Sequence, residues 1–354
     1  MSMRAKVQPI DVLGQAARWR DERRRVALAT VVATWGSSPR PVGSQLAVDD
    51  RNNMLGSVSG GCIEGAVAQE AATVMRTGEP QLLEYGVSDE QAWELGLACG
   101  GTVKVFVERL GGAPGMRRAL LDRLLQRLAQ KRPVALVTDL ATGRQSLIGD
   151  DRPEGELELD GERLAAAAGA MAADRSGVLP GEDGLFVQVF NPPPRMIVIG
   201  AVHIAQALVP MAELAGYEVV VVDPRGAWAT EERFPGVTVT KDWPDEALAR
   251  LDLDRRTAVV ALTHDPKLDD PALTVALGSE AFYVGALGSR RTHARRLERL
   301  REGGLSEADL ARIHGPIGLA LGARSPAEIA VSILAQVTQV LHGAPPPVSP
   351  EAAA

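Results

Sequence analysis

The sequence predicts an α/β protein, with an N-terminal mixed α+β domain followed by a Rossmann-like doubly wound domain built on a parallel sheet. Three observations lead to this prediction. The chain has 354 residues, which is too long for one ordinary core and long enough for two domains. The proline run "NPPPR" at residues 191–195 breaks the composition between two regular regions. After that break, continuous apolar strands alternate with helical patterns, which is typical of a parallel sheet covered on both faces.

The same pattern sets the domain limits. The first domain is expected at residues 1–190 and the Rossmann-like domain at residues 195–342. Residues from about 150 to 183 are rich in acidic residues, alanine and glycine, and are interpreted as a peripheral segment with one short helix. Residues 343–354 are expected to form a flexible tail.

The elements of the first domain follow from periodicity and turn residues. A polar helical pattern over residues 11–25 precedes "VALATVVATWG", which predicts a buried strand ending at Gly36. The turn formers "DDRNN" lie between "SQLAV" and "MLGSVS" and predict a hairpin. Small and apolar residues at helical spacing predict a helix over residues 62–77, closed by Gly78. The remaining patterns are a strand in "TVKVFVERL", an amphipathic helix in "GMRRALLDRLLQRLAQKR" and two strands in "PVALVTDLATGRQSLIG".

The second domain opens with a strand, a glycine turn and a helix that starts near His203. The next strand, "YEVVVVD", ends at Asp223, which lies 23 residues after Gly200, where dinucleotide-binding folds place a ribose-binding carboxylate. Val202, however, occupies the position of the second glycine of the fingerprint, and its side chain should obstruct a bound dinucleotide. The sequence therefore predicts the Rossmann topology and argues against NAD(P) as a ligand.

Polar residues follow the later apolar strands "AVVAL" and "FYVGA". The carboxyl ends of parallel strands share one sheet edge, where open α/β sheets bind ligands. Plainer interpretations stay open, because Asp265 before Pro266 suits a turn, His264 suits a loop, and the two arginines suit the solvated start of a helix. The candidate binding residues of this crevice are Gly200, His203, Asp223, Arg225, His264, Asp265, Gly288, Ser289, Arg290 and Arg291.

Composition limits the classes of partner. Formal net charge is −7, so no overall basic field indicates nucleic acid, and the basic run "RRTHARRLERLR" is interpreted as the solvated face of a helix. No apolar stretch approaches the roughly 20 residues that cross a bilayer, and the N-terminus has no signal pattern, so we expect no membrane partner and a cytoplasmic protein. The two cysteines, Cys62 and Cys99, are interpreted as free thiols in a reducing compartment.

Motifs from both domains closely resemble the xanthine dehydrogenase accessory-factor family, the XdhC/CoxI proteins, over nearly the whole chain. They are "GSSPRPVGSQLAV", "GSVSGGCIEG", "LACGGTVKVFVE", "VVVVDPR", "RFPG", "THDPKLDDPAL", "YVGALGSRRT" and "IHGPIGLALGARSPAEIAVSIL".

The resemblance implies a two-domain maturation factor, a homodimer that is more a non-catalytic chaperone than a dehydrogenase. Such a factor binds the molybdenum cofactor (molybdopterin) and holds it while a cysteine desulfurase installs its sulfido ligand. It then helps to insert the cofactor into an apo molybdenum hydroxylase of the xanthine dehydrogenase or CO dehydrogenase type. A xanthine dehydrogenase itself carries [2Fe–2S] clusters with four cysteine ligands each, and this chain has two cysteines.

The resemblance also carries over site residues. Cys62 falls on the family's Gly-Gly-Cys motif and Cys99 on its Cys-Gly-Gly motif. Two positions depart from the family pattern: Val202 replaces a glycine of the Rossmann loop, and Ala320 stands where an aspartate is common. Neighbouring matches are Ser38, Arg40, Gly60, Gly61, Glu64, Gly100 and Gly101.

The chemistry of these residues suggests roles. A thiol at a helix start is near free amide groups that favour thiolate, and thiolate is a soft ligand suited to molybdenum or to carrying sulfur, so Cys62 and Cys99 are candidate molybdenum contacts. Glu64 is a candidate proton relay, or a first-turn acid that complements the helix dipole. Arg40 could bind the cofactor's phosphate or only shape a loop. Both cysteines could instead be small buried hydrophobic residues.

Two other functions compete with the chaperone. One is an NAD(P)-dependent oxidoreductase that uses the crevice around Asp223 and His264, which Val202 disfavours. The other is a thiol or persulfide carrier in which Cys62 and Cys99 are partners, which requires the two sulfur atoms to be close in space.

Overall fold

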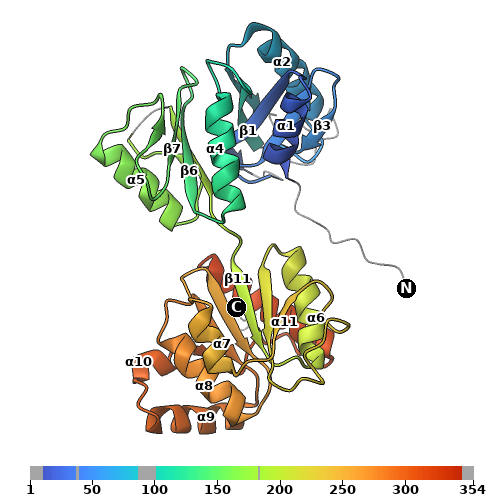
Figure 1. Cartoon of the computed structure of the whole chain (residues 1–354), viewed down its shortest axis with the longest axis vertical. Coiled ribbons are helices and arrows are strands. Elements are labelled where there is room, and N and C mark those ends of the chain that lie inside the picture. The colour runs from blue at the N-terminus through green and yellow to red at the C-terminus, as the bar shows by residue number, and fades with distance from the viewer. Residues whose placement is uncertain (1–10, 37–39, 87–100, 182–183, 345–354) are drawn as a thin grey trace, which may run out of the picture. The chain divides into compact units, whose positions relative to one another are not determined.

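A computed structural model describes residues 11–36, 40–86, 101–181 and 184–344 (Figure 1). The chain divides into two compact units, Met1–Pro192 and Pro193–Ala354, and the boundary lies inside the proline run. Each unit has its own sheets and cores.

The first sheet of unit 1 is antiparallel and has the order β3-β2-β1-β5-β4. Its strands are β1 (Val26–Gly36), β2 (Gln45–Asp49), β3 (Met54–Gly56), β4 (Gln81–Gly86) and β5 (Gly101–Arg109). Helix α2 (Glu64–Thr77) packs on one face, and α1 (Val12–Asp21) packs on the other. The hairpin of β2 and β3 and the left-handed Gly78 that ends α2 are confirmed. Strand β4, which the sequence analysis missed, is half exposed and joins the sheet by pairing with β5.

The second sheet of unit 1 is also antiparallel and has the order β8-β7-β6-β10-β9. Its strands are β6 (Val134–Asp139), β7 (Gln145–Ile148), β8 (Glu154–Gly155), β9 (Gly177–Val178) and β10 (Leu185–Phe190). Helix α4 (Arg118–Ala129) joins α1 and strands of both sheets in one hydrophobic cluster, and it lies beside β6 in Figure 1.

The segment from about 150 to 183 forms regular structure at the edges and on one face of the second sheet, and among its described residues Ala167 and Leu179 are buried. It supplies β8, β9 and helix α5 (Gly161–Ala172), which covers one face of the second sheet. Ala167 is fully buried there. Ala167 is small enough to let the helix approach the sheet closely, and the partly buried Ala166 and Ala170 pack against the same cluster.

Unit 2 is a doubly wound parallel sheet with the order β13-β12-β11-β14-β15-β16, and this confirms the Rossmann-like prediction. Its strands are β11 (Arg195–Ile199), β12 (Glu218–Val222), β13 (Thr238–Thr240), β14 (Thr257–Ala261), β15 (Tyr283–Ala286) and β16 (Ile313–His314). Its helices are α6 (His203–Leu214), α7 (Pro244–Arg250), α8 (Pro266–Leu277), α9 (Arg290–Glu302), α10 (Glu307–Leu310) and α11 (Pro326–Leu341).

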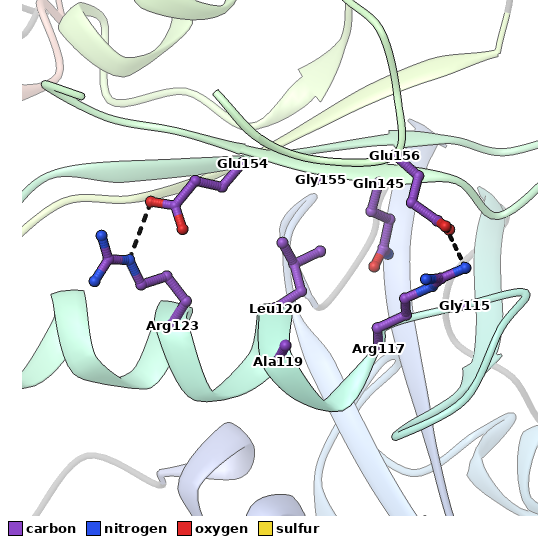
Figure 2. A pocket seen from close by; sticks show the side chains of 9 residues that line it. All are labelled: Gly115, Arg117, Ala119, Leu120, Arg123, Gln145, Glu154, Gly155 and Glu156. Atoms are coloured by element: carbon purple, nitrogen blue, oxygen red, sulfur yellow. Dashed lines mark hydrogen bonds and ion pairs between the residues drawn. The ribbon is translucent and has the colours of Figure 1, made fainter. Parts of the chain in front are cut away.

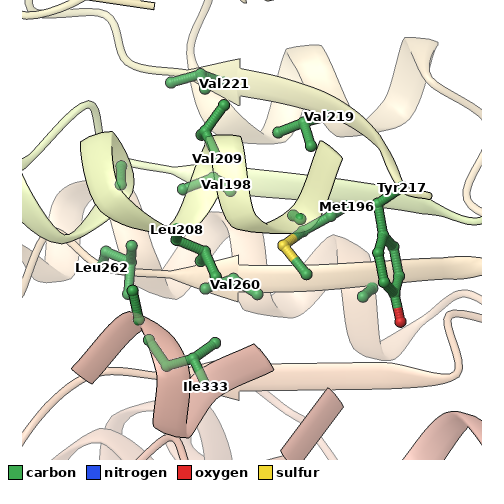
Figure 3. Packing of buried hydrophobic residues seen from close by; sticks show 14 of the residues in the cluster. Met196, Val198, Leu208, Val209, Tyr217, Val219, Val221, Val260, Leu262 and Ile333 are labelled. Atoms are coloured by element: carbon green, nitrogen blue, oxygen red, sulfur yellow. The ribbon is translucent and has the colours of Figure 1, made fainter. Parts of the chain in front are cut away.

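Alternation along the strands separates two cores. Met196 and Val198 of β11 pack with residues of α6 and α11, as Figure 3 shows around Leu208 and Ile333. Ile197 and Ile199 point to the opposite face, where α7 and α8 cover the sheet. This two-sided burial explains why the strands are continuously apolar in sequence.

Within the described residues, no helix combines the length and the apolarity that crossing a membrane requires.

Candidate functional site

A short loop, residues 57–63, joins β3 to α2 and carries Cys62. Gly60 and Gly61 have φ angles of 83° and 123°, a left-handed backbone that side chains rarely adopt. The Cys62 side chain is exposed, so the alternative of a small buried hydrophobic residue is wrong for this cysteine. The Gly-Gly pair therefore shapes a loop that presents a thiol to solvent.

Glu64, the first residue of α2, fixes this loop by accepting hydrogen bonds from it. Its Oε1 accepts hydrogen bonds from the Ser57 hydroxyl at 2.6 Å and the Ser59 amide at 2.9 Å. Its Oε2 accepts from the Ser59 hydroxyl at 2.5 Å and the Gly61 amide at 2.9 Å. The amides of Val58 and Gly60 also donate to Oε1, each at 3.1 Å. One carboxylate thus gathers the donors of five consecutive residues.

These contacts fix the charge of Glu64. Partial burial disfavours its ionised form, but the hydrogen bonds from Ser57 and Ser59 outweigh burial and lower the pKa of Glu64 to about 2. Both oxygens are occupied as acceptors at neutral pH, and this geometry favours a role in organising the loop over proton relay. The amides of Ser59, Gly60 and Gly61, which precede Cys62 in the loop, donate hydrogen bonds to Glu64.

The outer side of the loop is open while its inner side is anchored. Among the described residues, and apart from the chain neighbours and the backbone of α2 itself, no heavy atom lies within 4 Å of the positions where a Cβ would stand on Gly61 or Gly65. Val58 is fully buried, and Ile63 packs against the cluster that contains Val103 of β5. The loop is therefore anchored on its inner side, and on its outer side a bulky group can come close to the backbone.

Of the other predicted residues of unit 1, the structure describes Gly101 and Arg40. Gly101 pairs with Gly36 at the ends of β5 and β1, and the exposed Arg40 follows in the next bend. Ser38, Cys99 and Gly100 lie outside the described residues, so the partnership of Cys62 and Cys99 stays a prediction. Across the described ranges, no group of three or more His, Cys, Asp or Glu side chains is placed to hold a metal ion.

In unit 2, the glycine loop after β11 encloses Asp223. Gly200 has a φ of 105°, and a Cβ there would lie 2.6 Å from the Thr263 Cγ2 atom. The Ala201 amide donates to Asp223 Oδ2 at 2.8 Å, and the Arg225 guanidinium donates to both carboxylate oxygens at 2.9 and 2.7 Å. Burial of Asp223 opposes ionisation, but Arg225 outweighs it and lowers the pKa of this carboxyl group.

The Asp223 carboxylate therefore binds its own chain rather than being free for a ribose, which corrects the expectation from its position. Its side chain is fully buried. His203 instead lies edge-on to Trp228 at 6.3 Å, and Trp228 also contacts Arg225 and Arg233 through cation–π interactions. The sequence analysis did not single out Trp228.

The predicted residues after β14 and β15 serve mainly as helix caps. Asp265 accepts from the Lys267 amide and begins α8, as the turn interpretation expected, while Ser289 accepts from the Thr292 amide and begins α9. His264 is exposed, with a left-handed φ of 61°. Arg290 and Arg291 are exposed in the first turn of α9, and Gly288 precedes the cap with a φ of 150°.

A pocket of about 150 Å³ lies between α8 and α9, next to these caps. It contains Arg296, which is 2% exposed, so the interpretation of the basic run as a solvated face is wrong at this position. The signal that could have identified Arg296 is its spacing from Leu300, one helical turn later and also buried. The pocket is lined by His264, Pro266, Asp269, Asp270, Thr292, Arg295, Arg296 and Arg299.

A second pocket, of about 270 Å³, lies in unit 1 between α4 and the strands β7 and β8 (Figure 2). Ion pairs of Arg117 with Glu156 and of Arg123 with Glu154 flank it. Gln145 lines it and donates its amide to both oxygens of the buried Glu108 at 3.0 Å. Burial raises the pKa of Glu108 to about 7. No sequence motif indicated this site.

Comparison with known proteins agrees with both units. Residues 19–86 match the model of the XdhC and CoxI family, and residues 196–337 match that of the XdhC Rossmann domain. A relative from Escherichia coli K12, the molybdenum cofactor insertion chaperone PaoD, is 31% identical over 318 residues, which cover 89% of this chain and 83% of that protein. A Bacillus subtilis 168 protein named as a probable xanthine dehydrogenase component is 26% identical over 330 residues, covering 90% and 94%. A crystal structure described as a xanthine dehydrogenase from Bacillus halodurans superimposes with a TM-score of 0.75 at 25% identity, covering 96% and 98%.

Proposed function

The chain belongs to the XdhC and CoxI family, and from this premise we propose that it binds the molybdenum cofactor and delivers it to an apo molybdenum hydroxylase. A relative that is similar along most of its length is named as a molybdenum cofactor insertion chaperone, which supports the assignment. The observation that carries the proposal is the Cys62 loop: an exposed thiol on a backbone that Glu64 fixes in place.

The residues of this loop fit such a ligand. Cys62 offers a soft sulfur donor, the kind of ligand that a molybdenum centre accepts. The open space beside Gly61 and Gly65 leaves room for a bulky pterin near the backbone. The cofactor supplies the metal centre that the recipient enzyme uses, and this chain supplies binding, orientation and protection. Glu64 keeps the loop shaped before the ligand arrives, so little ordering cost remains at binding.

The finer steps extend the proposal. We place the protein in the cytoplasm as a homodimer, where a reducing environment keeps Cys62 a free thiol. It holds the cofactor while a cysteine desulfurase installs the sulfido ligand, and then transfers it to an apoenzyme of the xanthine dehydrogenase or CO dehydrogenase type. Cys99 and Arg40 belong to the same proposed site through the family resemblance.

The test is retention of the cofactor. Wild-type protein and the Cys62→Ala and Cys99→Ala variants are incubated with molybdenum cofactor, passed through gel filtration, and assayed for molybdenum by elemental analysis and for pterin by fluorescence. We expect the wild type to retain both in equal amounts and Cys62→Ala to lose at least about tenfold in affinity, the cost of one good ligand contact. Thermal unfolding of each variant controls for folding.

Transfer is measured separately, by adding the loaded protein to an apo molybdenum hydroxylase and following its activation. Retention without activation would show that the protein stores the cofactor but does not deliver it. A wild type that retains neither molybdenum nor pterin would overturn the proposal as a whole.

A further inference from the structure

The pocket between α8 and α9 contains a cation whose hydrogen-bonding capacity is only partly used. Arg296 is 2% exposed, and its Nη2 donates to the Leu287 carbonyl at 2.9 Å and to Asp269 Oδ2 at 3.4 Å. Its Nε and Nη1 are buried and have no hydrogen-bond partner among the described residues. A buried charged donor without an acceptor costs free energy, so native proteins usually give such a group a partner or a ligand.

The charged side chains that line the pocket, Arg296 included, carry more positive than negative charge. Arg295, Arg296 and Arg299 line it against the two carboxylates of Asp269 and Asp270. Asp270 is already occupied, because Arg299 donates to both of its oxygens at 2.6 and 3.0 Å.

Asp269 is largely occupied as well. Its Oδ1 accepts from the Thr263 hydroxyl at 2.6 Å, while Oδ2 makes the 3.4 Å contact with Arg296. Neither aspartate therefore satisfies the two free nitrogens of Arg296, and the exposed Arg295 adds a further positive charge at the rim.

The shape of the pocket is suited to a small ligand. It lies past the carboxyl ends of β14 and β15, the edge at which open parallel sheets bind ligands. Next to the pocket, a Cβ at Gly288 would stand 3.2 Å from the Thr292 side chain and 3.9 Å from Arg296 Nη1, so α9 begins in close contact with this glycine. Thr292 also lines the pocket, and its hydroxyl is in hydrogen-bond contact with the Ser289 hydroxyl at 2.9 Å.

We propose that this pocket binds a tetrahedral oxyanion of the phosphate class, held by the positive charge of the Arg296 guanidinium, which the two aspartates only partly satisfy, and by the exposed Arg295 at the rim. Thr292, Arg295 and His264 surround the same space from other directions, which suits a tetrahedral ligand better than a planar carboxylate. This site lies in unit 2 and does not depend on the function proposed for the Cys62 loop. The oxyanion is either free phosphate or the phosphate group of an organic ligand.

The experiment is isothermal titration of the full chain with inorganic phosphate and, in a second arm, with a nucleoside 5′-monophosphate, at constant ionic strength set with chloride. We expect phosphate to bind, and Arg296→Met to weaken it at least about tenfold, since a charge-assisted contact is lost. Arg295→Gln, at an exposed position that folding tolerates, should weaken it about threefold. Arg301→Gln is the matched control, because Arg301 lies on the same helix as Arg296 and pairs with Glu307 of α10 at the surface.

Tighter binding of the monophosphate identifies an organic phosphate as the ligand, and equal binding identifies the free anion. The proposal is overturned if neither compound binds the wild type, or if binding persists unchanged in both Arg296→Met and Arg295→Gln. Because the readout needs no molybdenum, failure here leaves the proposal for Cys62 standing, and the reverse also holds.

Discussion

Both units contain a glycine loop between a strand and a helix, and in both the loop amides bind a carboxylate of the same chain. In unit 1, Glu64 accepts from four backbone amides and two hydroxyls, and no cation contacts it among the described residues. In unit 2, the buried Asp223 accepts from the amides of Ala201 and Arg225 and is neutralised by the Arg225 guanidinium. The two loops reach the same result, a bound internal anion, by different means.

The difference teaches what a glycine motif predicts. Such loops are typical of anion sites, but whether the anion comes from outside depends on which donors the chain itself leaves free. Both glycine loops use their amides internally, whereas Arg296, which no motif marked, keeps free donors. Free donors, rather than glycines, identify the phosphate-class site.

The largest loss of stability is expected from removing a cation that neutralises a buried carboxylate. Arg225→Met should lower the free energy of unfolding by about 2–3 kcal/mol, because it leaves the Asp223 carboxylate buried without its cation. The Arg225 side chain is 39% exposed, so the cost stays at the lower end for a buried pair. Urea unfolding measures it. Arg233→Met is the control, since Arg233 contacts Trp228 without touching Asp223. Equal losses in both variants would show that packing on Trp228, not charge, matters.

Glu64 holds its loop by hydrogen bonds alone, so replacing it should lower the free energy of unfolding somewhat less and with a distinct pH dependence. Glu64→Gln should cost about 2 kcal/mol at pH 7, because an amide NH₂ replaces one acceptor and faces donors. The folded-state pKa of about 2 lies below the ordinary 4.5, so the wild type's advantage is complete above about pH 4.5 and is lost as pH falls toward 2. Unfolding curves from pH 2 to 8 measure this difference, with the exposed Glu79→Gln as control. A pH-independent difference would contradict the ionised, donor-saturated Glu64.

Glu108 is a third carboxylate, and it tests whether the number of hydrogen-bond donors decides whether a pKa is lowered or raised. Glu108 is buried, and its carboxylate has fewer donors than Glu64: the Gln145 side-chain amide and the Met116 backbone amide. Its folded-state pKa of about 7 exceeds the ordinary 4.5, so the wild type loses stability as pH rises between these values. Glu108→Gln should therefore be about 1 kcal/mol more stable than the wild type at pH 8 and nearly equal at pH 4.5. If Glu108→Gln instead lowered the free energy of unfolding at pH 8, as expected for Glu64→Gln, the number of donors would not explain the difference between these two carboxylates.

Periodicity and turn chemistry were enough to predict much of this fold. The apolar runs of β11 and β12, the helical spacing of α2 and the turn at residues 49–53 are local signals, and the structure contains each of them. Local signals fail where pairing with distant residues decides. Strand β4 depends on β5, and although α5 was expected as a short helix, the sheet on which it packs has strands that come from both sides of it in sequence.

The same limit applies to the sites. The Gly-Gly-Cys motif located the loop, and its exposed thiol is a property that sequence could suggest. The contacts of Asp223 with Ala201 and of Arg296 with Asp269 could not be predicted, because the partners lie 22 and 27 residues away in the sequence. A buried arginine in a basic run has the same local signature as a solvated one, apart from its spacing to Leu300.

The smallest effect on stability is expected at the residue with the largest proposed role. Cys62→Ser should change the free energy of unfolding by less than about 0.5 kcal/mol, because the side chain is exposed and the loop is held by Glu64 rather than by the thiol. Urea unfolding measures this, and cofactor retention is assayed on the same preparation. Loss of retention without loss of stability would assign binding to the sulfur atom itself. A large loss of stability would instead show that Cys62 supports the loop, and the two glycine loops would then differ in more than their counter-charges.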